Sequence, residues 1–154
     1  MFLYLFTIFF LTIQTIDVFV FEIGRRANIS LSKKICLAIL TADCAPIFLY
    51  DRNNELICAI HSGWRGCLNN IISKTLMKLK NISRSLKNAV AIIGPCLDQE
   101  NFEVDETFKE KFIRKNLYYK TFFGKKAGNN KIYFDMRGLI DLQLRELSIN
   151  DIFH

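Results

Sequence analysis

Two short apolar runs joined by a polar turn most constrain what this chain can fold into. Residues 47–50 and 56–60 are each apolar, short and bounded by polar residues, which is typical of buried strands. Between them, residues 51–54 read Asp-Arg-Asn-Asn, and Asp and Asn both bond to their own backbone and accept turn conformations. We therefore expect an antiparallel hairpin here.

Short apolar runs continue along the chain beyond residue 29. They predict three further strands, at residues 35–40, 89–93 and 132–134, and residues 124–130 read as a polar loop. Strands and helical patterns interleave without a regular βα period. The expected fold class is therefore α+β, with a mixed sheet flanked by helices.

Three helices are predicted from apolar residues at helical spacing. The first is an amphipathic helix over residues 66–80, and the last covers residues 136–147. Between these two, a helix begins after Asp105. We expect Asp105 and Asp135 to be N-caps, because an Asp carboxylate accepts bonds from the free N–H groups of the first turn.

Composition excludes several classes of protein. A chain of 154 residues suits one domain, and 51% hydrophobic with 23% charged residues excludes general disorder. The net charge of +6 is spread along the chain with no Lys/Arg run among aromatics, so no nucleic-acid partner is expected. Only His61 and His154 are histidines, which excludes a metal site of three histidines. Five cysteines with no C-x-x-C pair suit a reducing compartment, so we expect a cytoplasmic protein.

The first residues are apolar and rich in Phe. They lack the positive start and the small-residue cleavage site of a signal peptide, because the first positive charges are Arg25 and Arg26. We expect residues 1–28 to be separate from a domain over residues 29–154. One interpretation of the segment is a buried strand pair. An alternative is membrane attachment through residues 1–21, which would bury Asp17 at a cost of about 2.5–3.5 kcal/mol.

A Cys–His pair at the ends of the hairpin strands is the first candidate site. One strand register sets Cys44 opposite His61, with Cβ atoms about 4.5–5.5 Å apart. A turn centred one residue later sets His61 opposite Pro46 instead. A Cys and a His side by side could hold zinc or act as nucleophile and base. The alternative for Cys44 is a small buried apolar residue.

The loop that follows His61 is the second candidate. Gly63 and Gly66 bracket Trp64 and Arg65 just before the predicted helix, whose N-terminus would favour an anion. The guanidinium of Arg65 suits phosphate, and the ring of Trp64 suits a base or a sugar. An ordinary surface ion pair is the alternative for Arg65.

Other candidate residues carry weaker signals. Gly-Pro-Cys at residues 94–96 ends a predicted strand and forms a second loop. Glu103 lies between two apolar residues, which favours a solvent-exposed side chain. Cys36, Cys58 and Cys67 fall within strand or helix patterns and are expected in the core.

Four motifs in this order resemble those of a known family, the laccase-domain proteins once called multicopper polyphenol oxidases. Their better-supported role is that of purine nucleoside phosphorylases with adenosine deaminase activity. The resemblance runs from about residue 29 to residue 153, with Ser62 where the family usually has Ala and Phe102 where it has Tyr. The matching motifs are residues 41–46, 61–66, 94–96 and 102–104.

The resemblance implies an incomplete version of the laccase-domain α/β sandwich. It implies a metal, usually zinc (Zn²⁺) with copper as an alternative, held by one Cys and two His, of which Cys44 and His61 match two. The other family His lies in a Gln-Val-His-Gly motif about 35 residues before the Cys, where this chain has a Phe/Leu run. A later Ser-Tyr-Arg-Arg segment is also missing. We therefore expect a chain shortened at both ends, with weak metal affinity and little or no activity of the isolated chain, and a separate fragment could complete it.

The resemblance also implies the reaction. It is phosphorolysis of adenosine, inosine or S-methyl-5′-thioadenosine, with adenosine deamination as a second activity, so the partners are a purine nucleoside and phosphate. Asp43 and Arg65 are the expected catalytic residues, and Trp64, Arg65 and Gly66 the expected substrate-binding residues. Two alternatives remain. One is a metal-free hydrolase or deamidase with Cys44 as nucleophile, and the other is a non-catalytic fragment that is membrane-attached or completes a partner.

Overall fold

A computed structural model describes most of the chain beyond its first 20 residues. The described residues are 21–22, 27–31, 36–51, 53, 55–80, 86, 88–126, 128 and 130–154, with only the backbone described at residues 21–22 and 79–80. The strands are β1 (Phe21–Glu22), β2 (Ala27–Ser30), β3 (Ala45–Asp51), β4 (Leu56–Ser62), β5 (Ala89–Ile93), β6 (Glu103–Val104), β7 (Phe123–Lys125), β8 (Ile132–Phe134) and β9 (Asp151–Phe153). The helices are α1 (Trp64–Leu68), α2 (Ile71–Lys80), α3 (Glu106–Lys115), the 3-10 helix η2 (Leu117–Phe122) and α4 (Met136–Glu146).

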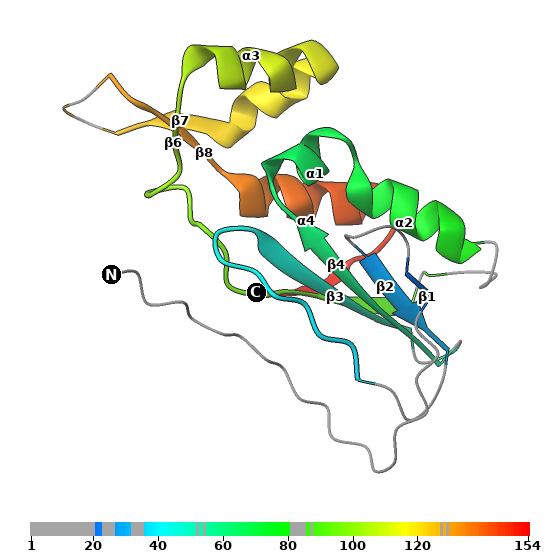
Figure 1. Ribbon diagram of the computed structural model, residues 1–154. Coiled ribbons are helices and arrows are strands. Elements are labelled where there is room, and N and C mark those ends of the chain that lie inside the picture. The colour runs from blue at the N-terminus through cyan, green and yellow to red at the C-terminus, as the bar shows by residue number, and fades with distance from the viewer. Residues whose placement is uncertain are drawn as a thin grey trace.

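Two sheets organise the molecule. The larger has six strands in the order β1-β2-β4-β3-β5-β9, in which β5 and β9 are parallel and every other neighbouring pair is antiparallel. The smaller has the order β6-β8-β7 and lies with α3 and η2 above the large sheet in Figure 1. The predicted α+β class, with a mixed sheet and flanking helices, is confirmed.

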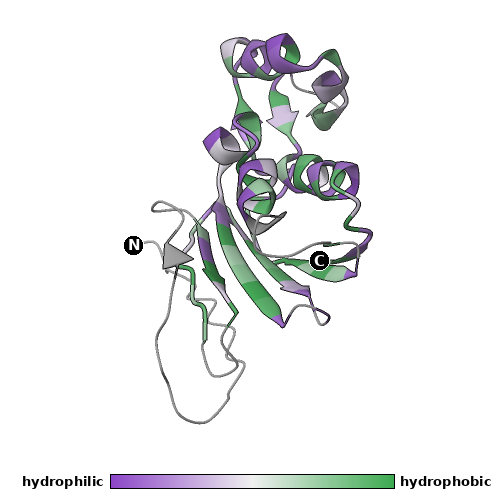
Figure 2. Cartoon of the chain, turned by 90° about the vertical axis from the view of Figure 1, so that its right-hand side faces the viewer, coloured by the Kyte–Doolittle hydropathy of each residue, from purple (hydrophilic) through white to green (hydrophobic). Residues whose placement is uncertain are grey.

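Helices α1, α2 and α4 cover one face of the large sheet (Figure 1). Alternate residues of β3 and β4 point to that face, and Ile47 and Ile60, which pair directly, are fully buried there. Each such burial contributes roughly 1.5–3 kcal/mol. Figure 2 shows apolar residues along these strands and a mixture of apolar and polar residues on the helices, as expected for amphipathic helices that pack on a sheet.

The opposite face of the large sheet is partly covered by the segment before β3. Residues 36–40 form no strand, so the strand predicted at residues 35–40 is wrong over its described part. The segment instead runs across the outer face, where Leu37 packs with Ala59. Cys36 is exposed there, so the prediction that it lies in the core is wrong. Cys58 and Cys67 are buried, as predicted.

Aromatic rings join the small sheet to the helices. Phe112 of α3 and Phe134 of β8 are fully buried with ring centroids 4.7 Å apart, and Phe123 stacks on Phe134 at 4.9 Å. The cap predicted at Asp105 is confirmed, because its carboxylate accepts a 2.6 Å hydrogen bond from the Phe108 N–H. Strand β7 takes up the first part of the loop predicted at residues 124–130.

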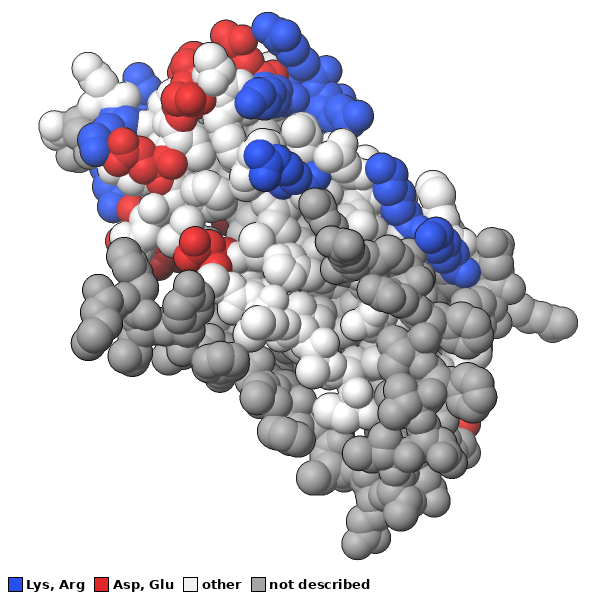
Figure 3. Space-filling model, in the orientation of Figure 1, with Lys and Arg blue, Asp and Glu red and all other residues white. Residues whose placement is uncertain are grey.

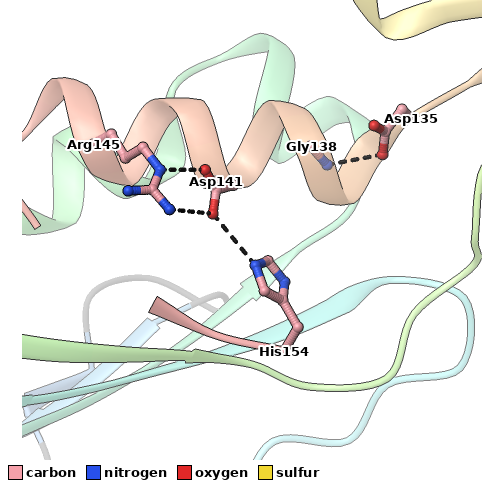
Figure 4. Close-up of polar contacts among 5 residues, drawn as sticks. All are labelled: Asp135, Gly138, Asp141, Arg145 and His154. Atoms are coloured by element: carbon pink, nitrogen blue, oxygen red, sulfur yellow. Dashed lines mark hydrogen bonds and ion pairs between the residues drawn. The ribbon is translucent and has the colours of Figure 1, made fainter. Parts of the chain in front are cut away.

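Helix α4 is held at its start and near its end (Figure 4). The predicted cap is confirmed, since the Gly138 N–H donates to the Asp135 carboxylate at 2.8 Å. Further along, the Asp141 carboxylate accepts a 2.6 Å bond from Arg145 Nε and lies 3.3 Å from His154 Nε2. His154 follows β9, so this contact links the edge strand to the helix layer.

The expected boundary between residues 28 and 29 falls inside strand β2. Strand β1 pairs with β2, so residues 21–22 already belong to the sheet. Residues 1–20, on which the anchor and strand-pair interpretations depend, lie outside the described residues. Among the described residues, no helix is both long and apolar enough to cross a membrane.

Candidate functional site

Three segments singled out in the sequence meet at one end of the large sheet. Strand β4 ends there, β5 ends there, and the antiparallel strand β3 begins there. Two backbone hydrogen bonds join the start of β3 and the segment just before it to the loop after β5. The Gly94 N–H donates to the Pro46 carbonyl at 2.8 Å, and the Leu97 N–H donates to the Asp43 carbonyl at 3.0 Å.

The hairpin register differs from the one that sets Cys44 opposite His61. In the structure His61 pairs with Pro46, which is the alternative register with the turn centred between residues 53 and 54. The turn ends at Glu55, whose positive φ of 49° is a left-handed conformation. The predicted direct opposition of Cys44 and His61 is therefore wrong.

Cys44 and His61 nevertheless share a face of the sheet. The residue at the position opposite Cys44 is Gly63, and a Cβ atom added at Gly63 would lie 2.6 Å from Cys44 Sγ. The backbone of Gly63 is extended (φ −88°, ψ −178°), so that Cβ would point to the same side as His61, two residues before it. Such diagonal neighbours lie about 7–8 Å apart, within reach of a long side chain. Both residues are partly buried on the face away from the helices.

The loop after His61 does not lead into one long helix. Helix α1 begins at Trp64 and ends at Leu68, and α2 begins at Ile71, so the helix predicted over residues 66–80 is broken. The break occurs because Asn70 has a φ of 53°. A helix of five residues is too short for the anion-binding N-terminus that the prediction assumed.

Gly66 lies inside α1 and is buried. A Cβ there would approach Ser62 Oγ and Ile71 Cγ2 at 3.1 Å each, so the glycine allows α1 to pack closely against β4 and α2. Ser62 Oγ lies 3.3 Å from Cys67 Sγ in the same packed region. Gly66 therefore has a role in packing. Its predicted contact with the substrate stays a prediction.

Trp64 and Arg65 are the first two residues of α1. The exposed Arg65 guanidinium stacks over the Trp64 ring, with its Cζ 4.4 Å from the ring centroid. Trp64 also packs on Phe108 at 5.0 Å, and Phe108 lies 6.0 Å from Phe102. This chain of rings brings the motif at residues 102–104 toward the same region. Glu103 is exposed, as expected, and pairs with Lys131 at 2.6 Å.

Cys96 has a neighbour that the sequence did not indicate. Arg137, at the start of α4, places an NH2 group 3.7 Å from Cys96 Sγ. Partial burial nevertheless raises the pKa of Cys96, because desolvation outweighs the charge of Arg137. No local pattern marks Arg137, and only the packing of α4 beside the loop after β5 brings the two together.

The thiols on the helix side of the large sheet are inert. Burial raises the pKa of Cys58 to about 12. Burial likewise raises the pKa of Cys67 to about 12, and its hydrogen bond with Ser62 lowers it by less. A thiol must lose its proton to act as a nucleophile or a metal ligand, so neither is a candidate for such a role.

The donors of a metal site are only partly assembled. Among the described residues, no three His, Cys, Asp or Glu side chains are grouped so that they could hold a metal ion. A zinc site takes three protein ligands even when it is catalytic, and four when it is structural. Cys44 and His61 alone therefore do not fit a complete zinc or copper site.

Comparison with known proteins identifies the family. The sequence model of a family described as multi-copper polyphenol oxidoreductase laccase matches residues 21–154. The chain belongs to this laccase family. The match includes the whole large sheet and every candidate site residue.

Several laccase-family relatives extend well beyond this chain. A purine nucleoside phosphorylase of Rickettsia conorii is 35% identical over 125 residues, which cover 81% of this chain and 51% of that protein. An adenosine deaminase from an unknown prokaryotic organism is 25% identical, over 74% of this chain and 44% of that protein. A crystal structure of a Neisseria meningitidis protein matches with a TM-score of 0.72 and 26% identity, over 83% of this chain and 51% of that one. The chain thus spans about half the length of these relatives.

Proposed function

We propose that this chain carries part of the active site of a purine nucleoside phosphorylase. The observation that supports it most is the convergence of residues 41–46, 61–66 and 94–96 at one end of the sheet, in a chain whose relatives include purine nucleoside phosphorylases. The substrates would be inorganic phosphate and adenosine, inosine or S-methyl-5′-thioadenosine. Adenosine deamination is the proposed second activity, supported by the relative named for it.

Phosphorolysis requires a held phosphate and a purine that can leave. A phosphate oxygen attacks C1′ of the ribose, the C1′–N9 bond breaks, and the purine leaves with the bonding electrons and gains a proton. Arg65 would hold the phosphate, because its guanidinium is always charged, exposed here and shaped to bind two oxygens at once. Asp43, exposed beside the loop after β5, would orient a substrate group or accept a proton.

The remaining proposed contacts come from α1. Trp64 would lie against the base or the sugar, and Gly66 keeps α1 close to the end of β4.

The five cysteines are all free thiols in the structure, which agrees with the proposed cytoplasmic location.

A direct assay tests the reaction. The purified chain, supplied with zinc, is incubated with adenosine with and without phosphate, and adenine and ribose 1-phosphate are measured. We expect slow, phosphate-dependent release of adenine that Arg65→Gln abolishes. Release that does not require phosphate, or that Arg65→Gln leaves unchanged, would contradict the proposal.

Zinc, with copper as the alternative, is proposed to bind Cys44 and His61 together with a donor from outside the described residues. Metal content after dialysis tests this independently of activity. We expect weak zinc binding that His61→Ala and Cys44→Ser each abolish. The matched controls are His154→Ala and Cys36→Ser, which replace the other histidine and an exposed cysteine and should retain the metal. Zinc retained by His61→Ala would contradict the assignment.

A second candidate is a metal-free hydrolase or deamidase with Cys44 as nucleophile and His61 as base. The placement of both side chains on one face of the sheet is compatible with it. Alkylation by iodoacetamide separates the two functions. A zinc-bound Cys44 thiolate is protected until a chelator is added, whereas a catalytic thiolate reacts at the same rate with and without the chelator.

A further inference from the structure

Two cations from different helices lie against the same indole ring. Arg65 of α1 places its Cζ 4.4 Å from the centroid of Trp64, and Lys111 of α3 places its Nζ 5.8 Å from that centroid. The two charges are therefore at most about 10 Å apart, roughly one Debye length at 0.1 M salt, so their repulsion is incompletely screened. Trp64 is the one tryptophan of the chain.

Two other cations of α3 are paired with carboxylates of the same helix. Lys109 pairs with Glu106 at 2.6 Å, and Arg114 pairs with Glu110 at 3.1 Å. Within the described part of the chain, neither Arg65 nor Lys111 has a carboxylate oxygen within 4.0 Å. The carboxylate whose pKa responds to the charge of Lys111 is Asp105, and it is already bonded to Thr107 and to the Phe108 N–H.

The surroundings favour an anion. Figure 3 shows Lys and Arg side chains gathered along the upper right of the molecule, over α3 and the α1–α2 layer, while the visible Asp and Glu side chains lie mainly at the upper left. A positive region of this kind attracts anions and concentrates them locally. An exposed cation over an indole gains only about 0.5–1 kcal/mol, so the two cations can turn to a stronger partner at small cost.

We propose that Arg65 and Lys111, set on either side of the α1–α3 contact by Trp64, form a binding site for a tetrahedral anion, inorganic phosphate. Arg65 supplies a planar fork for two oxygens and Lys111 supplies a mobile point charge. The identity of the anion rests on the proposed phosphorolysis, and Lys111 is the residue that it adds. Trp64 and Arg65 directly follow Gly63, which packs against Cys44.

Trp64 makes the site observable without any turnover. Its fluorescence, excited where tyrosine does not absorb, is titrated with phosphate and separately with chloride at equal ionic strength. Equilibrium dialysis with labelled phosphate gives the same dissociation constant independently of the indole. We expect saturable binding of phosphate, and a dissociation constant raised about two- to fivefold in Lys111→Gln, the size expected when one exposed ion pair is lost. Lys115→Gln, an exposed lysine on the same helix, should bind as the unaltered chain does.

Each outcome decides the proposal. Unchanged phosphate affinity in Lys111→Gln overturns it, as does an equal response to chloride or an equal loss in Lys115→Gln. Phosphate binding without any phosphorolysis would contradict the proposed function and leave this site in place. Phosphorolysis whose KM for phosphate is the same in Lys111→Gln would support the proposed function and contradict this site.

Discussion

Cys58 and Cys44 lie near opposite ends of the central hairpin and on opposite faces of the large sheet. Cys58 points to the helix layer, where burial raises its pKa to about 12. Cys44 lies on the outer face, partly exposed, with His61 on the same side. The comparison shows that the helix face of the large sheet is a solvent-excluded core, whereas Cys44 and His61 keep partial exposure at the strand ends.

Alkylation should separate the two faces by the largest factor. Burial raises the pKa of Cys58 and of Cys67 from 9.0 to about 12, so their thiolate fractions near neutral pH are roughly a thousandfold lower than that of an ordinary thiol. We expect iodoacetamide to label the exposed Cys36 first and to leave these two unlabelled, as measured by peptide mass spectrometry. In urea all five cysteines should react alike. Labelling of Cys58 at the rate of Cys36 in the folded chain would mean that the helix layer opens readily.

Core substitutions should also distinguish the two faces. Ile60→Ala removes a fully buried side chain on the helix face and should cost about 2–5 kcal/mol of unfolding free energy. Ile57→Ala, on the same strand but partly exposed on the outer face, should cost clearly less. Urea unfolding curves measure both. Equal losses would show that the segment over residues 36–40 seals the outer face as well as the helices seal the other.

The buried thiols predict a loss of stability at alkaline pH. Their pKa values are raised on folding, so the unfolded chain loses these protons first, and stability present below about pH 9 falls as pH rises toward 12. At pH 10 the loss is roughly 1–2 kcal/mol per thiol. Unfolding curves at pH 8 and pH 10 should show it, and Cys58→Ala should reduce the difference. A Cys36→Ala chain, altered at an exposed thiol, serves as the control.

The cap of α4 should have the smallest of these effects. Asp135→Ala removes the acceptor of the 2.8 Å bond from the Gly138 N–H and should cost about 1 kcal/mol. Asp135→Asn keeps an acceptor oxygen and should retain most of the stability. Thermal unfolding of the two variants provides the comparison, and equal losses would show that the charge matters more than the hydrogen bond.

Local chemistry made part of the fold predictable. The caps at Asp105 and Asp135 follow from one side chain and three neighbouring residues, and the strands at residues 89–93 and 132–134 have the predicted bounds. The break in the first helix was missed because apolar spacing continues across Asn69 and Asn70. Only the left-handed backbone of Asn70 ends the helix there.

The residues of the candidate site could be proposed from the sequence, but their geometry could not. Cys44 and His61 were identified from their positions at strand ends, but their register depends on the conformation of the turn that ends at Glu55. The contacts of Cys96 with Arg137 and of Trp64 with Lys111 join distant parts of the chain. They arise from the packing of α3 and α4, which no local spacing encodes.

The close approach of Cys44 Sγ to Gly63 makes these two positions interdependent. A methyl group at residue 63 would occupy the space of the sulfur, so Gly63→Ala must displace the thiol or strain the loop. Combining it with Cys44→Gly should relieve that clash, so the double variant should be more stable than Gly63→Ala alone. Sequences that keep a cysteine at position 44 are therefore expected to keep a glycine at position 63, and the two residues should covary.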